Sequence, residues 1–561
     1  MFRREEIEGR TDLLPRRAWL IMPLAVVLFV AAGLILEQIP GLDQGRLALR
    51  GHAGPGGVPD SGDVARLLED SAHWLGARGV LSGNPPRIPS TLVLSEEQID
   101  TEVPTLSIVA DEDSLYDPDT GILVNRRAKG RDWERLSWIS YWEGGRLLVA
   151  SRAGLRVHGD RARGDLGILS FRLNFRPLYG TSAAQGAKLL GGQVDAAPAV
   201  VVRVVRPPDA FTNSFGFDIA RRIGSPAPQS RPARLYLNGE ERGVYLLTEH
   251  VSPEAFGVTY FGHPDFYMFI PKGQVDRDSL AAYQSLEAWV LEHDSLSMQE
   301  AATRVDVDNL TRHLFTLMFC FTTDWAQGAV LYDRTDPEAR WFWVHWDMDL
   351  SFGARGGRVK NAYELPVVQL ITLEGETETL RRLSIITDQR HTQRHENDLR
   401  RLLLLRLLED EAYRSYFVRL ATDMLNHRLT PEYFDSLLET RRNLARRSGN
   451  FGRLDLRTYF HERPDFVLAE LAQYFGLEAA VEVTVSAPAS SSFSPPELRI
   501  DGFQEILPYR GRYFPGQTIK IETTTEAGPK LSHWLVDGES LARSELVFTV
   551  EHSTIIQPVF K

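Results

Sequence analysis

Two aspartates that are two residues apart, Asp347 and Asp349, are the residues of this sequence best suited to hold a metal ion. They belong to an aromatic segment, residues 341–353, whose alternation predicts a strand with one apolar, buried face. On the other face the two carboxylates are expected about 7 Å apart at Cα, where they repel each other unless a cation lies between them. Mg²⁺ accepts such a pair and completes its shell with water and phosphate oxygens. The alternative, two aspartates capping a solvated turn, remains open from the spacing alone.

Asp324 is a third acid that we expect near this pair. It follows residues 309–321, which are apolar on nearly every side and therefore predict a buried helix. Residues 329–333 then predict a strand that pairs with the aromatic segment, so the hairpin should bring Asp324 to the end where Asp347 and Asp349 lie. A loop aspartate followed about twenty residues later by a metal-holding aspartate is typical of kinase-like phosphoryl transfer.

From about residue 104 to residue 477 the sequence resembles the spore-coat CotH family of atypical, protein-kinase-like proteins. The resemblance rests on motifs in this order: Gly121-Ile122, Gly130-x-Asp132-Trp133-Glu134-Arg135, Gly154-Leu155-Arg156-Val157-His158-Gly159, Ser170-Phe171-Arg172-Leu173, Leu237-Asn238-Gly239 with Gly243-Val244-Tyr245, Asp324, Trp346-Asp347-x-Asp349-x-Ser351-Phe352-Gly353 and Arg463-Pro464. It implies binding of ATP with Mg²⁺ or Mn²⁺ and phosphorylation of Ser or Thr in a protein substrate. It also implies that Asp324 is the catalytic residue and that Asp347 is the principal metal ligand, with Asp349 beside it.

Four further residues are candidates for contacts with the nucleotide. Arg161 and Arg163, in the glycine-bounded loop 159–167, could form bidentate hydrogen bonds with phosphates, although an ordinary solvated hairpin is the simpler interpretation of this loop. Lys272 and Glu249 could form the ion pair found in kinase-like sites. Each of these two could instead be a surface charge.

At two places the sequence departs from the family it resembles. Leu169 occupies the position before Ser170 where the family commonly has lysine, and Gly328 lies among residues where the family often has asparagine. Loss of a lysine that neutralises phosphate costs several kcal/mol of transition-state stabilisation unless an arginine substitutes. The substitutions therefore favour an alternative to an active kinase, a kinase-like scaffold or binding protein of the cell envelope without turnover. A metal-dependent hydrolase built on the same acids is a third possibility.

The N-terminus predicts a membrane anchor. Residues 18–36 contain no charge and are long enough as a helix to span a hydrocarbon core of about 30 Å. Arginines are concentrated before this segment, so residues 1–17 are expected in the cytoplasm, residues 18–37 as a transmembrane helix and the bulk of the chain outside a bacterial inner membrane. A cleaved signal peptide is the competing interpretation, but the end of the apolar segment lacks an Ala-x-Ala-like cleavage site.

The remaining chain predicts an α+β fold. Residues 38–103 read as a linker with a short helix, and residues 104–478 as a two-lobed kinase-like domain with a β-rich first part and a helical second part. Residues 479–561 predict a small β domain, which resembles internalin-type surface repeats and could equally be a plain β-sandwich.

Charge and cysteine content narrow the function further. The 561 residues include 75 acids and 63 bases, for a net charge of −12, which argues against a nucleic-acid partner. Cys320 is the single cysteine, so the chain has neither an internal disulfide nor a cysteine metal cluster. The expected partners are therefore a nucleotide, a protein substrate or envelope protein, and the membrane.

Overall fold

A computed structural model describes residues 94, 96–159, 169–205, 211–270, 275–353, 362–372, 397–448, 455–486, 498–523 and 531–560. All of them lie within Asp60–Lys561, the larger of the two compact units of the chain. The expected cytoplasmic segment 1–17 and transmembrane segment 18–37 lie outside the described residues, as does most of the expected linker 38–103.

The first seven strands form a closed barrel in the order β1-β2-β3-β4-β5-β7-β6. Their bounds are β1 Thr105–Ala110, β2 Arg135–Glu143, β3 Arg146–His158, β4 Ser170–Asn174, β5 Ala199–Val204, β6 Ser230–Leu237 and β7 Glu240–Glu249. Neighbours pair antiparallel except β1 and β6, which run parallel and join Thr105 to Arg234 and Ile108 to Leu237. That pairing closes the barrel.

Alternation along the barrel strands separates an apolar interior from a basic outer face. Leu155 and Val157 of β3 pack inside with Phe171 and Leu173 of β4, in one buried cluster. Because side chains alternate, the neighbouring positions on β3, β4 and β5 lie on the outer face. Those positions hold three arginines, Arg156, Arg172 and Arg203.

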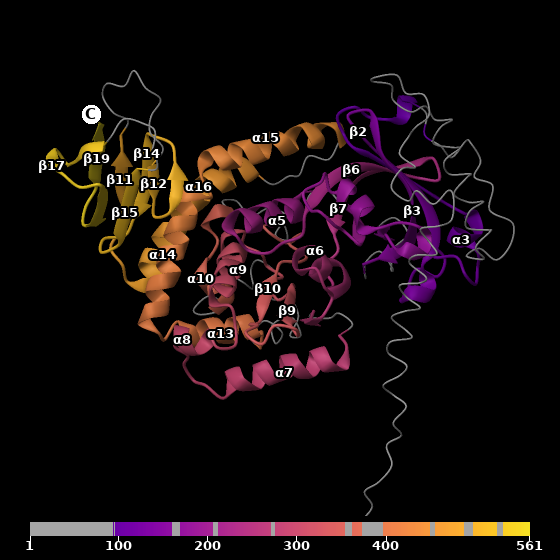
Figure 1. The fold of residues 1–561 in the computed structure, drawn as a ribbon, viewed down its shortest axis with the longest axis horizontal. Coiled ribbons are helices and arrows are strands. Elements are labelled where there is room, and N and C mark those ends of the chain that lie inside the picture. The colour runs from indigo at the N-terminus through magenta and orange to yellow at the C-terminus, as the bar shows by residue number, and fades with distance from the viewer. Residues whose placement is uncertain are drawn as a thin grey trace, which may run out of the picture. The chain divides into compact units, whose positions relative to one another are not determined.

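A second, larger core is built from helices around a three-stranded sheet in the order β10-β9-β8 (Figure 1). The strands are β8 Phe266–Phe269, β9 Ala329–Asp333 and β10 Phe342–Val344. The helices of the described residues are α3 Glu112–Tyr116, α4 Ala183–Leu189, α5 Thr212–Ile223, α6 Val258–Phe261, α7 Arg277–Leu291, α8 Met298–Ala301, α9 Val307–Phe319, α10 Val368–Thr372, α13 Leu399–Leu407, α14 Glu411–His427, α15 Pro431–Ser448 and α16 Leu456–Phe475.

The C-terminal strands form two sheets over a hydrophobic core of their own. One sheet has the order β14-β11-β19-β16-β17 and the other the order β13-β12-β15-β18. The strands are β11 Val481–Val485, β12 Leu498–Ile500, β13 Phe503–Glu505, β14 Tyr509–Tyr513, β15 Thr518–Thr523, β16 Leu531–Val536, β17 Glu539–Leu541, β18 Glu545–Thr549 and β19 Thr554–Phe560. The side chain of Asn426 on α14 bonds both backbone groups of Arg512 on β14, at 2.8 and 2.9 Å.

The predicted fold class is wrong in two respects. The expected two-lobed α+β domain is a mixed α/β fold whose first strands close into a barrel, and the partners that close it, β1 and β6, are too distant in sequence for local alternation to indicate their pairing. None of the described helices is both long and apolar enough to cross a membrane. The structure therefore does not support the predicted transmembrane helix, whose residues 18–37 lie outside the described part of the chain, or the single-pass inner-membrane localisation.

Candidate functional site

The segment with Asp347 and Asp349 leaves the sheet earlier than predicted. Strand β10 ends at Val344, and Asp347 has a φ of 60°, in the left-handed region that strand residues do not adopt. Helix α5 holds this turn, because the Met348 N–H donates to Asn213 Oδ1 at 2.7 Å and Thr212 Oγ1 donates to the Asp349 carbonyl at 2.9 Å. Surrounding contacts thus impose an unfavourable backbone conformation on an aspartate, a feature that is concentrated at functional sites.

Arg203 of β5 joins the two aspartates. Its Nη2 donates to Asp347 Oδ1 and, at 2.9 Å, to Asp349 Oδ2. The three side chains are 23%, 30% and 35% exposed, so the cluster is open to solvent on one side. Burial alone would lower the pKa of Arg203, but Asp347 and Asp349 outweigh it and hold that pKa above its ordinary value. The cation that the two carboxylates share in the structure is thus an arginine side chain, and the metal at this pair stays a prediction.

Asp324 follows the predicted buried helix, which the structure confirms as α9. The residue before it, Thr323, donates from its backbone N–H to the Leu350 carbonyl at 3.0 Å, so the two acidic segments run beside each other. The Asp324 carboxylate accepts a hydrogen bond from Gln327 Nε2 at 2.9 Å. Burial would lower the pKa of Arg400, but the negative charge of Asp398 and, to a smaller extent, that of Asp324 raise this pKa above its ordinary value. Asp324 and Asp349 are thus each the neighbour in sequence of a residue in this backbone hydrogen bond, and Gln327 holds the Asp324 carboxylate.

Two histidines stack on each other next to this turn, and one of them, His345, lies two residues before Asp347 in sequence. His313 of α9 and His345 lie with ring centroids 4.0 Å apart, and His345 Nε2 hydrogen-bonds Ser225 Oγ at 2.9 Å. Burial, reinforced by nearby Arg400, lowers the pKa of His345 to about 3, so this ring is neutral. Neutral packing of this kind fixes the chain that leads into Asp347.

A basic cavity of about 190 Å³ lies on the outer face of β3 and β4. Arg156, His158, Arg172 and Lys129 contribute to its lining. Arg156 pairs with Glu134 at 2.7 Å, whereas Arg172 donates to His250 Nε2 at 2.9 Å and pairs with no carboxylate of the described residues. Burial, together with the like charge of Arg156, lowers the pKa of Arg172 to about 10. An arginine without a matching anion in a cavity is well suited to a phosphate.

The cavity and the acidic turn adjoin each other. The His158 ring, which lines the cavity, makes an edge contact with Trp346 at 6.4 Å between centroids, and Trp346 directly precedes Asp347. Strand register gives the same result, since Arg172 pairs with Val201 and Arg203 lies two residues further along β5 on the same face. The outer face of β4 and β5 therefore carries Arg172 at the cavity and Arg203 at the two aspartates.

The other predicted nucleotide contacts divide into two groups. Arg161, Arg163 and Lys272 lie outside the described residues. Glu249 is fully buried, and its Oε2 accepts hydrogen bonds from Tyr260 OH at 2.9 Å and from the Gln229 N–H at 3.2 Å. Burial raises the pKa of Glu249 to about 7.

Arg203 and Arg172 are the site residues that the sequence analysis missed. Each is a single cation between apolar residues of a strand, Val202 and Val204 in one case and Phe171 and Leu173 in the other. A lone charge in such a context indicates a partner or a ligand on the polar face of the strand. Leu169, which occupies the position of the family's lysine, is buried in the barrel core and makes no polar contact.

Comparison with known proteins shows the family of this chain. No curated protein matches the sequence. The family model described as CotH kinase protein matches residues 156–462, more than half of the chain, and this range includes Arg172, Arg203, Asp324, Asp347 and Asp349. The resemblance to internalin-type repeats is not confirmed by these comparisons. The chain belongs to the CotH kinase family.

Proposed function

We propose that this chain is a protein kinase that binds a magnesium nucleotide and transfers a phosphoryl group to Ser or Thr of a protein substrate. The observation that supports this most directly is the turn at Asp347, where two carboxylates share one cation under backbone strain. Asp324, beside this turn, is the proposed residue that orients the acceptor hydroxyl and accepts its proton.

The aspartate pair suits a hard divalent ion. Both groups offer carboxylate oxygens, both are partly exposed, and an ion here would leave room for water and phosphate ligands. Mg²⁺ or Mn²⁺ held by Asp347 and Asp349 would neutralise charge that develops on the phosphates. Arg203 must release at least one carboxylate for this to happen, and β5 leaves it close enough to remain a phosphate contact.

The basic cavity is the proposed place for the nucleotide phosphates. Arg172 is the proposed source of the positive charge that the family's lysine would supply, although it lies on the outer face of β4 and Leu169, just before this strand, packs inside the barrel. Electrostatic neutralisation of phosphate is usually the largest contribution to this class of reaction, so an arginine in the cavity can take the place of the lysine.

Arg203 also favours a second candidate, a kinase-like binding protein without turnover. Its guanidinium already neutralises both aspartates, and breaking these ion pairs opposes metal binding. In this alternative the cavity still binds an anion, but the aspartates keep Arg203.

A direct test compares the wild-type protein with Asp347→Asn. We expect the wild type to bind ATP in a Mg²⁺-dependent manner and to transfer radiolabel from the γ-phosphate to protein, and the variant to lose both by at least about 100-fold. Asp333→Asn, at the far end of the same hairpin, is the control and should behave as wild type. Nucleotide binding without transfer identifies the binding protein, and release of free phosphate without labelled protein identifies a hydrolase. Either result contradicts the kinase proposal.

A further inference from the structure

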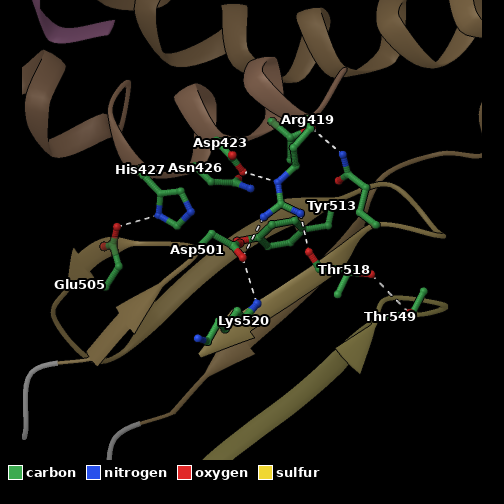
Figure 2. A network of polar contacts seen from close by, with 12 residues as sticks. Arg419, Asp423, Asn426, His427, Asp501, Glu505, Tyr513, Thr518, Lys520 and Thr549 are labelled. Carbon is green, nitrogen blue, oxygen red and sulfur yellow. Dashed lines mark hydrogen bonds and ion pairs between the residues drawn. The ribbon is translucent and has the colours of Figure 1, made fainter. Parts of the chain in front are cut away.

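A second group of cation-binding side chains lies between α14 and the β12–β13 turn (Figure 2). Asp423 and His427 come from α14 and Asp501 from the turn, and one donor atom of each lies within 4.8 Å of the others. Asp423 and His427 are four residues apart, so they share one face of the helix. The group is far in sequence from Asp347 and Asp349 and has no part in the function proposed above.

His427 has an unsatisfied nitrogen. The residue is 5% exposed, its Nδ1 donates to Glu505 Oε1 at 2.7 Å, and its buried Nε2 has no hydrogen-bond partner among the described residues. The rings of Phe503 and Tyr509 stack on the imidazole, with centroids at 4.5 and 5.4 Å. Figure 2 shows the second nitrogen turned away from Glu505, toward the side where Asp423 and Asp501 lie. A carboxylate that fixes one nitrogen and leaves the other as a lone pair is typical of metal-binding histidines.

The two aspartates also keep acceptor capacity. Arg419 donates from Nε to Asp423 Oδ1 at 2.9 Å and from Nη2 to Asp501 Oδ1 at 2.8 Å. Asp501 Oδ2 is buried and has no partner in the described part of the chain. Two carboxylates thus share one guanidinium and a third, Glu505, holds His427, so a divalent ion would balance the excess of negative charge.

We propose that Asp423, His427 and Asp501 bind a first-row transition ion, with zinc as the best match, and that this ion fastens the C-terminal β strands to α14. An imidazole nitrogen with carboxylate oxygens selects zinc-like ions, whereas magnesium prefers oxygen ligands alone. Ligand atoms around zinc lie about 3.4 Å apart, so closure from the observed spacing needs only small side-chain rotations. Arg419 keeps the Oδ1 atoms and orients both carboxylates.

The ion would strengthen an interface that already has both apolar and polar contacts, since buried Phe514 packs into the helical core. Asn426 bonds the backbone of Arg512, and Arg419 donates to the carbonyl of Thr518, next to the proposed site. A metal that draws one ligand from the turn and two from the helix binds only when the two elements are docked, so zinc should stabilise the docked form.

The test uses the full chain with Asp347→Asn and Asp349→Asn, so that the first acidic pair does not share the titration. After chelator treatment we expect calorimetry to detect one equivalent of Zn²⁺ and Co²⁺ to give the absorption bands of an imidazole-bound ion. His427→Gln should weaken zinc binding about 100-fold or more, and Glu505→Gln, which leaves all three ligands in place, about 10- to 100-fold. Zinc should raise the midpoint of thermal unfolding of this parent and leave that of His427→Gln unchanged.

Two matched controls separate metal binding from altered packing. His461→Gln removes a histidine that pairs with Asp435 at 3.2 Å elsewhere. Asp537→Asn changes a turn built like that of Asp501, since each Oδ1 accepts a backbone hydrogen bond, at 2.8 and 2.9 Å. Both should bind zinc as the parent does. Absence of zinc binding by the parent, or zinc binding by His427→Gln as tight as that of the parent, would overturn the proposal and leave a network of hydrogen bonds around Arg419 in its place.

Discussion

Replacement of Arg203 by methionine tests how the acidic turn binds a metal. Methionine keeps much of the apolar length of the side chain and removes the guanidinium that now bridges Asp347 and Asp349. In the wild type a divalent ion has to displace this guanidinium from at least one carboxylate. In the variant both carboxylates are available, so we expect tighter metal binding.

The size of the effect follows from the two ion pairs. All three side chains are between a fifth and about a third exposed, so each pair contributes about 1 kcal/mol, near the upper end for partly solvated pairs. A metal that displaces Arg203 from both carboxylates of the wild type loses about 2 kcal/mol, and this cost is absent in the variant. Since 1.4 kcal/mol is a factor of ten, the affinity of the variant for the ion should be about 30-fold higher.

Mn²⁺ binding measured by electron paramagnetic resonance, without nucleotide, isolates this step from any contact of Arg203 with phosphate. Arg231→Met is the matched control, because Arg231 forms a two-bond pair with Glu143, at 2.6 and 3.1 Å, on the same barrel and with 19% exposure. It should leave Mn²⁺ affinity unchanged. Equal or weaker Mn²⁺ binding by a folded Arg203→Met protein would refute the idea that arginine and metal compete for these aspartates.

Three further changes test other parts of the structure. Arg463→Met should lower the free energy of unfolding, measured in urea, by about 2–4 kcal/mol, because buried Arg463 donates to the carbonyls of Met318, Phe319, Tyr363 and Leu365. Glu249→Gln should flatten the pH dependence of stability. Burial raises the pKa of Glu249 to about 7, so the folded state binds this proton more tightly than the unfolded state. Between pH 5 and pH 8 the free energy of unfolding of the wild type should therefore fall by about 2 kcal/mol relative to that of the variant. Asp324→Asn should reduce phosphoryl transfer by about 100-fold or more with nucleotide affinity unchanged.

Each of these changes has a control and a contrary result. Exposed Arg457, on the same helix as Arg463, should tolerate methionine within about 0.5 kcal/mol, and equal losses at both positions would argue against the four-carbonyl contact. Glu240→Gln, on the exposed end of β7, should keep the wild-type pH profile, and a matching profile in Glu249→Gln would exclude Glu249 as the titrating group. A loss of nucleotide affinity in Asp324→Asn as large as its loss of transfer would assign Asp324 to binding.

The parts of the site that could be predicted are those set by local periodicity. The buried helix expected over 309–321 is α9, Val307–Phe319, and the expected hairpin is formed by β9 and β10, with Val330 opposite Trp343. Apolar spacing determines both, because each element has to bury its own side chains. Alternation failed at Asp347, where a backbone with φ of 60° ends the extended conformation and where the contact with Asn213, from a helix more than a hundred residues earlier, decides the turn.

Counter-charges are what the sequence could not assign. Spacing identified Asp347 and Asp349 as a pair that needs a cation, but Arg203 lies 144 residues from Asp347 in sequence and reaches the pair only because it projects from the outer face of β5 in the closed barrel. At the second group, Asp423 and His427 lie one turn apart on α14, while Asp501 and Glu505 come from the β12–β13 hairpin. Each arginine takes one oxygen from each of two aspartates, but the second group also has Asp501 Oδ2 and His427 Nε2, which have no partner in the described residues. A metal at Asp347 therefore competes with Arg203, whereas a metal at the second group has ligand atoms that Arg419 does not occupy, so removal of the arginine should strengthen ion binding at Asp347 and weaken it at Asp501.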